Sequence, residues 1–212
     1  MTNINFLLQD FFNRNPDIAK ARNKDLVNRR ALAKYIIKHE TLDKNKIEAL
    51  ITALRRFEVK KESEDNLSSL FKEINITTKD NIIIINLEKN EQVLEDLSKV
   101  IPLINFSKNE TLKIVQGSLS VKLFIDNFNL KKIKDIFLEK NILRIHKEIA
   151  ELSLIFPEKA IKTKGIISYV TSQLLINDIN IIELLTCTPE LIIYVEEKSL
   201  VKAYESIKRL KT

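Results

Sequence analysis

Asn81-Ile82-Ile83-Ile84-Ile85-Asn86-Leu87 is a run of β-branched residues that predicts a buried strand. Directly after it, the apolar residues between Asn90 and Pro102 recur at helical spacing, with Asn90 placed to cap a helix and Pro102 placed to end it. The hydrophobic pattern therefore changes from the period of a strand to the period of a helix. This stretch indicates a mixed unit of sheet and helix rather than a helical bundle.

The same order of elements continues beyond Pro102 and then repeats. Gln116-Gly117-Ser118 is a hairpin signal between two apolar runs, and an amphipathic helix is expected behind Asn129. The elements predicted for the second copy are a strand at 152–156, a helix at 165–175, strands at 181–185 and 191–195, and a helix at 198–209. Two units of βαββα order are therefore expected in tandem.

Each unit needs a fourth strand to complete a ferredoxin-like βαββαβ sheet. Residues 142–149 supply one to the first unit, but the second unit reaches Thr212 without one. Ile74-Asn75-Ile76-Thr77 lies just before the first unit and alternates as a strand does. Because a bare sheet edge is a liability, we expect this segment to fill the second unit's edge. The two units are therefore predicted to be interleaved.

The segment before these units has a different pattern. Residues 5–57 contain no glycine, and their apolar residues follow helical spacing. Asn15-Pro16, Asn28 and Asp43 are helix-start signals, so four helices are expected when a first helix at 6–13 is included. The sequence thus predicts an α+β protein that begins with an all-α, helix-turn-helix-like domain. The expected boundaries are a helical domain at 1–62, a linker at 63–71, a first βαββαβ unit at 72–149 and a second at 150–212.

The net charge of +6 is concentrated in the helical segment. Residues 1–62 hold 14 Lys/Arg and 8 Asp/Glu, whereas the rest of the chain holds 21 of each and is neutral. A polyanionic partner is therefore expected to meet the N-terminal segment.

Three segments of the second unit together resemble the ACT domain at the C-terminus of aspartate kinases: Lys164-Gly165-Ile166-Ile167, Asn177-Asp178-Ile179-Asn180-Ile181 and Leu191-Ile192-Ile193-Tyr194-Val195-Glu196. The first unit resembles the same fold by its element order, and in that family two copies interlock through a borrowed strand. Two N-terminal segments, Asp25-Leu26-Val27-Asn28-Arg29-Arg30-Ala31-Leu32-Ala33 and Ala53-Leu54-Arg55-Arg56-Phe57, look similar to uncharacterised archaeal proteins that pair such a helical domain with ACT repeats.

The resemblance implies a regulatory protein whose sheets lie side by side in a homodimer and bind an amino acid near the loop at 157–165. Family members that bind ligands usually have a glycine-rich approach there, whereas this loop has Gly165 alone, with lysines that can hold an anion. Asn180 matches the family's asparagine at the start of the second strand. The implied ligand-binding residues are Lys162, Lys164, Gly165, Asn180 and Ile181.

The residues that catalysis or cofactor binding would need are scarce. Cys187 is the one cysteine, and neither His39 nor His146 lies in a recognisable catalytic motif. Two glycines cannot build a Walker loop or a dinucleotide fingerprint, and the cysteine and histidines are too few for a four-ligand zinc site without carboxylates. We therefore expect no enzyme activity, no catalytic residue, no cofactor and no bound metal.

The basic helices are the remaining signal for function. The candidate nucleic-acid-binding residues are Arg29, Arg30, Lys34, Lys38, Arg55, Arg56, Lys60 and Lys61. Contacts from these side chains to phosphates make binding salt-sensitive. A helix-turn-helix turn often contains glycine, and its recognition helix presents Asn, Gln and Arg to bases. This segment has no glycine and no clear recognition helix of that kind, so backbone contact with structured RNA or the ribosome is favoured over sequence-specific DNA binding.

The leading prediction is a homodimeric ACT-repeat regulator that senses an amino acid and contacts RNA or the ribosome. Two alternatives stay open: a ribosome-dimerising or hibernation-type factor without a small ligand, and an amino-acid-responsive DNA-binding regulator. No apolar run is long enough to span a membrane, and the first 12 residues have acidic Asp10 and no basic residue, unlike a secretory signal. A cytoplasmic location without membrane contact is therefore expected.

Overall fold

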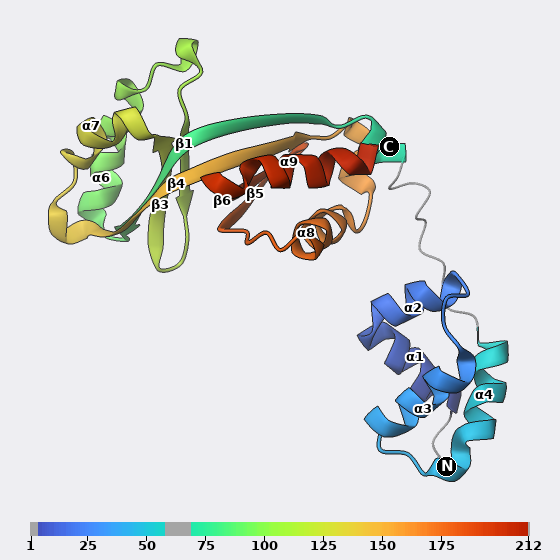
Figure 1. Cartoon of the computed structure of the whole chain (residues 1–212). Coiled ribbons are helices and arrows are strands. Elements are labelled where there is room, and N and C mark those ends of the chain that lie inside the picture. The colour runs from blue at the N-terminus through green and yellow to red at the C-terminus, as the bar shows by residue number, and fades with distance from the viewer. Residues whose placement is uncertain (1–3, 58–68, 212) are drawn as a thin grey trace. The chain divides into compact units, whose positions relative to one another are not determined.

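The computed structural model describes residues 4–57 and 69–211. The chain divides into two compact units, residues 1–64 and 65–212 (Figure 1). Lys60 and Lys61, and the polar stretch expected to act as a linker at 63–68, lie outside the described residues. Residues 69–71 were expected to belong to the linker, but they are helical, and Leu70 and Phe71 are buried in the core of the second unit.

The N-terminal compact unit, called the helical unit below, is the expected set of four helices. They are α1 (Ile4–Arg14), α2 (Pro16–Asn23), α3 (Arg29–His39) and α4 (Ile47–Arg56), with a 3-10 turn at Lys44–Lys46 before α4. The apolar stripes of these helices meet in one core that includes Leu8, Phe11, Ile36 and Leu54. The helices therefore form because each buries one face against the others.

Each predicted start signal precedes a helical segment, but Asp43 precedes the 3-10 turn, where its side chain accepts from the Asn45 N–H, and α4 itself begins at Ile47. The Asn28 side-chain oxygen accepts hydrogen bonds from the backbone N–H groups of Arg30 at 2.9 Å and Ala31 at 3.1 Å, so Asn28 caps α3 as predicted. Asn15 occupies the N-cap position of α2, with Pro16 in the first turn as predicted, but its side chain makes no capping hydrogen bond. Its side-chain amide instead donates to the Phe11 carbonyl at 2.8 Å, because Asn15 is the single residue between α1 and α2 and closes the last turn of α1.

Left-handed residues other than glycine end several helices. Asp25, Thr41 and Asp178 have φ values of 56°, 51° and 52°. After Asp25, the backbone N–H of Leu26 donates to the Ala21 carbonyl at 2.9 Å, which is the closing bond of a Schellman motif. Asp25 therefore does at the α2–α3 turn what glycine usually does, so a missing glycine is no obstacle to a helix-turn-helix turn here.

The C-terminal compact unit, called the sheet unit below, contains both βαββαβ repeats and is built on one six-stranded antiparallel sheet in the order β2-β3-β1-β4-β6-β5. The strands are β1 (Asn75–Glu88), β2 (Leu112–Gln116), β3 (Ser120–Asp126), β4 (Ile142–Ile155), β5 (Glu183–Cys187) and β6 (Glu190–Glu196). The helices are α6 (Glu91–Val100), α7 (Leu130–Lys134), α8 (Ile166–Ile176) and α9 (Leu200–Lys208). Figure 1 shows β1 and β4 as two long neighbouring strands that run from the α6 and α7 end to the α8 and α9 end.

The predicted interleaving is confirmed by the pairing of β1 with β4. Asn75, Ile76 and Thr77 pair with Ile155, Leu154 and Ser153, so the start of β1 is the fourth strand of the second repeat. The prediction of separate strands at 142–149 and 152–156 is wrong. These residues form the single strand β4, because its first half closes the first repeat and its second half opens the other.

Both long strands change backbone conformation at their centres. Asn81 in β1 has φ 55° and Glu148 in β4 has φ 57°, and the register between the strands shifts there. Extra residues of this kind bend a strand and increase its local twist. Asparagine tolerates the left-handed region, whereas glutamate is uncommon there. The two bulges thus separate the sheet into two halves, one for each repeat.

The helices cover one face of each half, and the opposite faces of the two halves meet. Alternate residues of β1 point to different cores: Ile83 and Ile85 pack with α6 and α7, whereas Ile82 and Ile84 pack with Phe124 of β3 and Tyr194 of β6. The rings of Phe124 and Tyr194 stack at 4.5 Å between centroids, although β1 and β4 lie between their strands in the sheet. Neighbouring strands are about 4.8 Å apart, so in a flat sheet β3 and β6 would be about 14 Å apart. The ring contact therefore requires the sheet to fold over on itself.

Polar side chains also link the two halves in this interface. The Lys113 ammonium on β2 and the Tyr194 hydroxyl both donate to Glu151 Oε2 at 2.7 Å, and Lys122 on β3 pairs with Glu183 on β5. Burial, and then the charge of Glu151, raise the pKa of Tyr194 far above its usual range, so its hydroxyl remains a donor. These contacts fix how the two repeats face each other.

We expect Phe124→Ala to lower the free energy of unfolding of the sheet unit by about 3–5 kcal/mol, because the side chain is fully buried where the two halves meet. Phe128→Ala is the matched control, because that ring is 67% exposed and its loss is expected to change stability by less than about 0.5 kcal/mol. Denaturant unfolding of the full chain measures both values. Equal effects of the two variants would contradict the face-to-face packing.

Candidate functional site

The loop expected to approach a ligand joins β4 to α8. It contains the 3-10 turn Glu158–Lys162, and both Lys162, at the end of this turn, and Lys164 are exposed. Gly165 precedes α8 with φ 86°, a conformation that favours glycine, so this residue is explained by the turn itself. Lys159 of the same loop pairs with Glu73.

Asn180 and Ile181 lie at the other end of α8. Asn180 is exposed and Ile181 packs against the core, in the segment that leads from α8 to β5. Because α8 has 11 residues, its two ends are about 16 Å apart. The structure of one chain therefore does not bring Asn180 and Ile181 together with Lys162, Lys164 and Gly165.

Six of the predicted nucleic-acid-binding residues are described, and all six are exposed on the helical unit. Arg29, Arg30 and Arg55 line one hollow beside the start of α3, together with Asp25, Asn28 and Glu48. Two of them form long, exposed ion pairs with acidic neighbours, with 3.9 Å between Arg29 and Asp25 and 3.8 Å between Arg30 and Glu48. Exposed pairs of this kind contribute little, so these guanidinium groups remain available to a polyanion.

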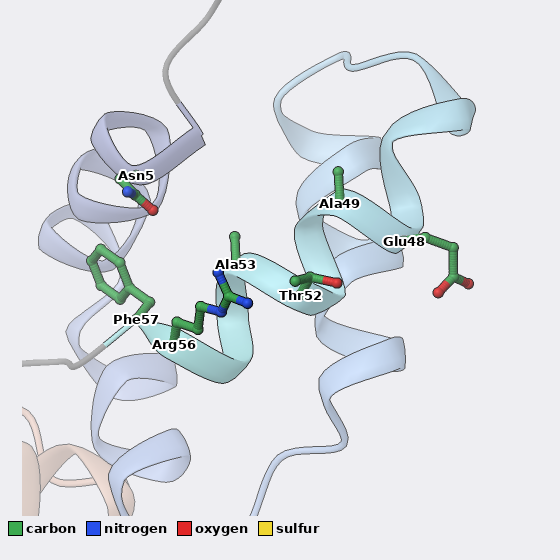
Figure 2. Close-up of a pocket in the computed structure, with 7 residues that line it drawn as sticks. All are labelled: Asn5, Glu48, Ala49, Thr52, Ala53, Arg56 and Phe57. Atoms are coloured by element: carbon green, nitrogen blue, oxygen red, sulfur yellow. The ribbon is translucent and has the colours of Figure 1, made fainter.

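The other basic side chains of the helical unit point to two places. Lys34 and Lys38 follow Arg30 at intervals of four residues, so the three form a stripe along α3. Arg56 lines a second hollow, which Figure 2 shows along one side of α4, with Phe57 and Asn5 of α1 beside it. Ala49, Thr52 and Ala53 of α4 also line this hollow with small side chains.

Arg22 has a role that sequence reasoning missed. Its Nη2 donates to the carbonyls of Leu54 and Phe57, both at 2.5 Å, and its guanidinium lies 5.6 Å from the Phe12 ring centroid. Burial, and then the charge of Arg29, lower the pKa of Arg22. Arg22 thus ties α2 to the last turn of α4. The last carbonyl groups of a helix have no partner within the helix, and here the Arg22 guanidinium supplies one. No feature of the sequence distinguishes it from the exposed arginines nearby.

The residues considered for catalysis are dispersed. Cys187 is exposed at the end of β5, the His39 ring lies 4.1 Å from the Tyr35 ring, and His146 is half-buried in β4. Within residues 4–57 and 69–211, no group of three or more His, Cys, Asp or Glu side chains is arranged to hold a metal ion. The described helices include none that is both long and apolar enough to cross a membrane.

Known structures share the fold of the sheet unit. Aspartate kinase from Clostridium acetobutylicum matches 65% of this chain with 22% identity and a TM-score of 0.53, over 34% of its own length. The regulatory subunit of aspartate kinase from Thermus flavus matches 65% of this chain with 10% identity and a TM-score of 0.52, over 97% of its length. A structure of aspartokinase alpha and beta subunits matches 64% with 16% identity and a TM-score of 0.52, over 96% of its chain.

The chain thus spans about a third of the whole Clostridium enzyme and nearly all of the matched chains in the other two structures. No family model and no curated protein matches the sequence. Residues 69–211 therefore have the tandem ACT fold of aspartate kinase regulatory regions, and the fold implied by the sequence resemblance is confirmed.

We expect Arg22→Ala to lower the stability of the helical unit by about 2–3 kcal/mol, because two carbonyls lose a charged donor. Lys20→Ala on the same helix removes an exposed cation and is expected to change stability by less than about 0.5 kcal/mol. Hydrogen exchange of residues 4–57 in the full chain measures the difference. If both variants exchange alike, Arg22 is not a structural clamp.

Proposed function

We propose that this chain is a non-enzymatic regulator. Its tandem ACT unit forms a homodimer and senses an amino acid, and its basic helical unit contacts the phosphate backbone of structured RNA or of the ribosome. The observation that carries the proposal is the tandem ACT fold of residues 69–211, together with a net charge that is confined to the helical segment. A regulator of this design couples a ligand-binding dimer to two copies of a weak polyanion-binding unit.

Apolar side chains on the outer surface of α8 support dimerisation. Leu175 is 76% exposed, Ile176 75% and Ile167 46%, so this helix presents apolar area that one chain leaves uncovered. A two-fold axis perpendicular to α8 makes this helix and its copy in the second chain antiparallel. The loop at Lys164 in one chain then lies near Asn180 of the other, which reunites the two halves of the predicted ligand site.

We expect Leu175→Glu combined with Ile176→Glu to convert the dimer into a monomer, because each chain would place two carboxylates against the apolar Ile167 end of α8 in the other chain. Leu119→Glu is the matched control, since Leu119 is 88% exposed at the tip of the β2–β3 hairpin. Sedimentation velocity of the full chain reports the oligomeric state. A wild-type monomer, or a dimer that survives the double substitution, would refute this interface.

The geometry of the basic residues supports contact with phosphates. Arg29, Arg30 and Arg55 converge on one hollow, and the lysines of α3 extend the positive surface along the helix. Sequence-specific DNA binding is the second candidate, favoured by Asp25, whose left-handed conformation provides the α2–α3 turn. RNA remains the leading partner, because the exposed stripe of α3 carries Arg and Lys, which pair with phosphates, and lacks the Asn or Gln that would read adenine.

We expect Arg29→Glu with Arg30→Glu to abolish salt-sensitive migration of the protein with ribosomes from its own cell lysate. Loss of two phosphate contacts lowers the slope of log K against log salt by about 1.5–2. Lys131→Glu with Lys132→Glu makes the same charge change on α7 and is expected to leave migration intact. If the wild-type protein migrates with naked duplex DNA and not with ribosomes, the DNA-binding candidate is favoured. If it migrates with neither ribosomes nor DNA, polyanion binding is refuted.

A further inference from the structure

The centre of the β1–β4 pair contains two equivalent places, one in each repeat. Lys79 pairs with Glu151 and His146 pairs with Ile84, so Lys79 and His146 occupy matching positions on either side of the bulges. In the same way, Asp126 pairs with Ile82 and Glu196 pairs with Ile149. The two places therefore have Lys79 with Asp126 on one side and His146 with Glu196 on the other.

The first place is filled by the ammonium group of Lys79. It lies 2.8 Å from Asp126 Oδ1 and donates hydrogen bonds to Thr111 Oγ1 and the Asn109 carbonyl, both at 2.7 Å. The backbone N–H of Thr111 donates to Asp126 Oδ2 at 2.7 Å and holds that carboxylate in position. This half of the protein thus contains a formed binding site for one primary ammonium, and its own chain occupies it.

The second place is an open hollow. A histidine side chain is shorter than a lysine side chain, so His146 does not reach across as Lys79 does, and the space is lined by side chains of both charges. Its lining includes Asn81, His146, Lys147, Glu148, Glu196 and Lys198. Burial, and then the charge of Arg144, lower the pKa of His146, so its ring is mainly neutral at pH 7. The carboxylate that acts on this ring is Glu183, whereas Glu196 is paired with Lys198.

The present partner of Glu196 is easily displaced. Lys198 lies 2.6 Å from Glu196 Oε2, but the two side chains are 81% and 49% exposed, and exposed pairs of neighbouring residues contribute little. A ligand ammonium that takes Glu196 releases Lys198 for a ligand carboxylate. Glu148, which forms part of the wall, is held at φ 57°, and strained residues of this kind cluster at ligand sites.

We propose that this hollow binds a free amino acid. Its α-ammonium lies on Glu196, in the place equivalent to the Lys79 ammonium, and its α-carboxylate lies on Lys198 and Lys147. This inference rests on the proposed amino-acid sensing, and it moves the ligand from the α8 loop to the bend of the sheet. The site is complete within one chain, whereas the loop site needs a second copy.

The test is calorimetric titration of the full-length protein with each of the twenty protein amino acids at millimolar concentration. For an amino acid that binds, its N-acetyl derivative and its decarboxylated amine are expected to bind at least about tenfold more weakly, because each lacks one of the two charges. Glu196→Gln is expected to weaken binding by a similar factor. Glu205→Gln, the same change at an exposed position of α9, is expected to leave the affinity unchanged.

A second variant tests the equivalence of the two places. His146→Lys is expected to place an ammonium on Glu196, as Lys79 does on Asp126, and to abolish binding while thermal stability is kept. Retained affinity in both Glu196→Gln and His146→Lys, with loss in Lys164→Ala, would overturn this inference and leave amino-acid sensing at the loop intact. If none of the twenty amino acids binds the wild-type protein, both this site and the proposed sensing are refuted.

Discussion

Antiparallel pairing between β1 and β4 is the interaction on which the sheet unit depends. Each strand has 14 residues, so each passes through both repeats, and every other strand of the sheet pairs with one of these two or with its neighbour. Without the first residues of β1, the second repeat has no fourth strand, and β4 is left with an unpaired edge. Neither repeat can therefore complete its sheet alone, and the two are one folding unit rather than two linked domains.

The bulges at Asn81 and Glu148 allow this shared pair to bend, and the bend brings the helix-free faces of the two halves together. A sheet with one face against helices normally leaves the other face to solvent or to another layer. Here each half supplies that layer to the other, with Phe124 stacked on Tyr194 at the centre. The buried Glu151 then has a cation from β2 and a hydroxyl from β6, which satisfies the charge and makes other arrangements of the halves costly.

The two repeats are related by approximate two-fold symmetry around this bend, so equivalent positions can be compared. Positions that build the interface are of similar type in both repeats, as Phe124 and Tyr194 are, whereas Lys79 and His146 differ in length and charge at equivalent places. One repeat thereby closes a polar site that the other leaves open. The helical unit has no part in this symmetry. Its exposed cations lie along α3 and α4, and the partly buried Arg22 donates to carbonyl groups at the end of α4.

The sequence by itself determined the element types and their order, because hydrophobic periodicity reports which face of each local segment is buried. It also determined the borrowed strand at Ile74-Asn75-Ile76-Thr77, the cap at Asn28 and the location of the net charge. Only the tertiary structure decided that β4 is one strand, that Arg22 is a clamp rather than a surface charge, and that Lys162 and Asn180 lie at opposite ends of α8. These facts depend on contacts between residues far apart in the chain, and a local pattern carries no information about which distant partner a side chain will meet.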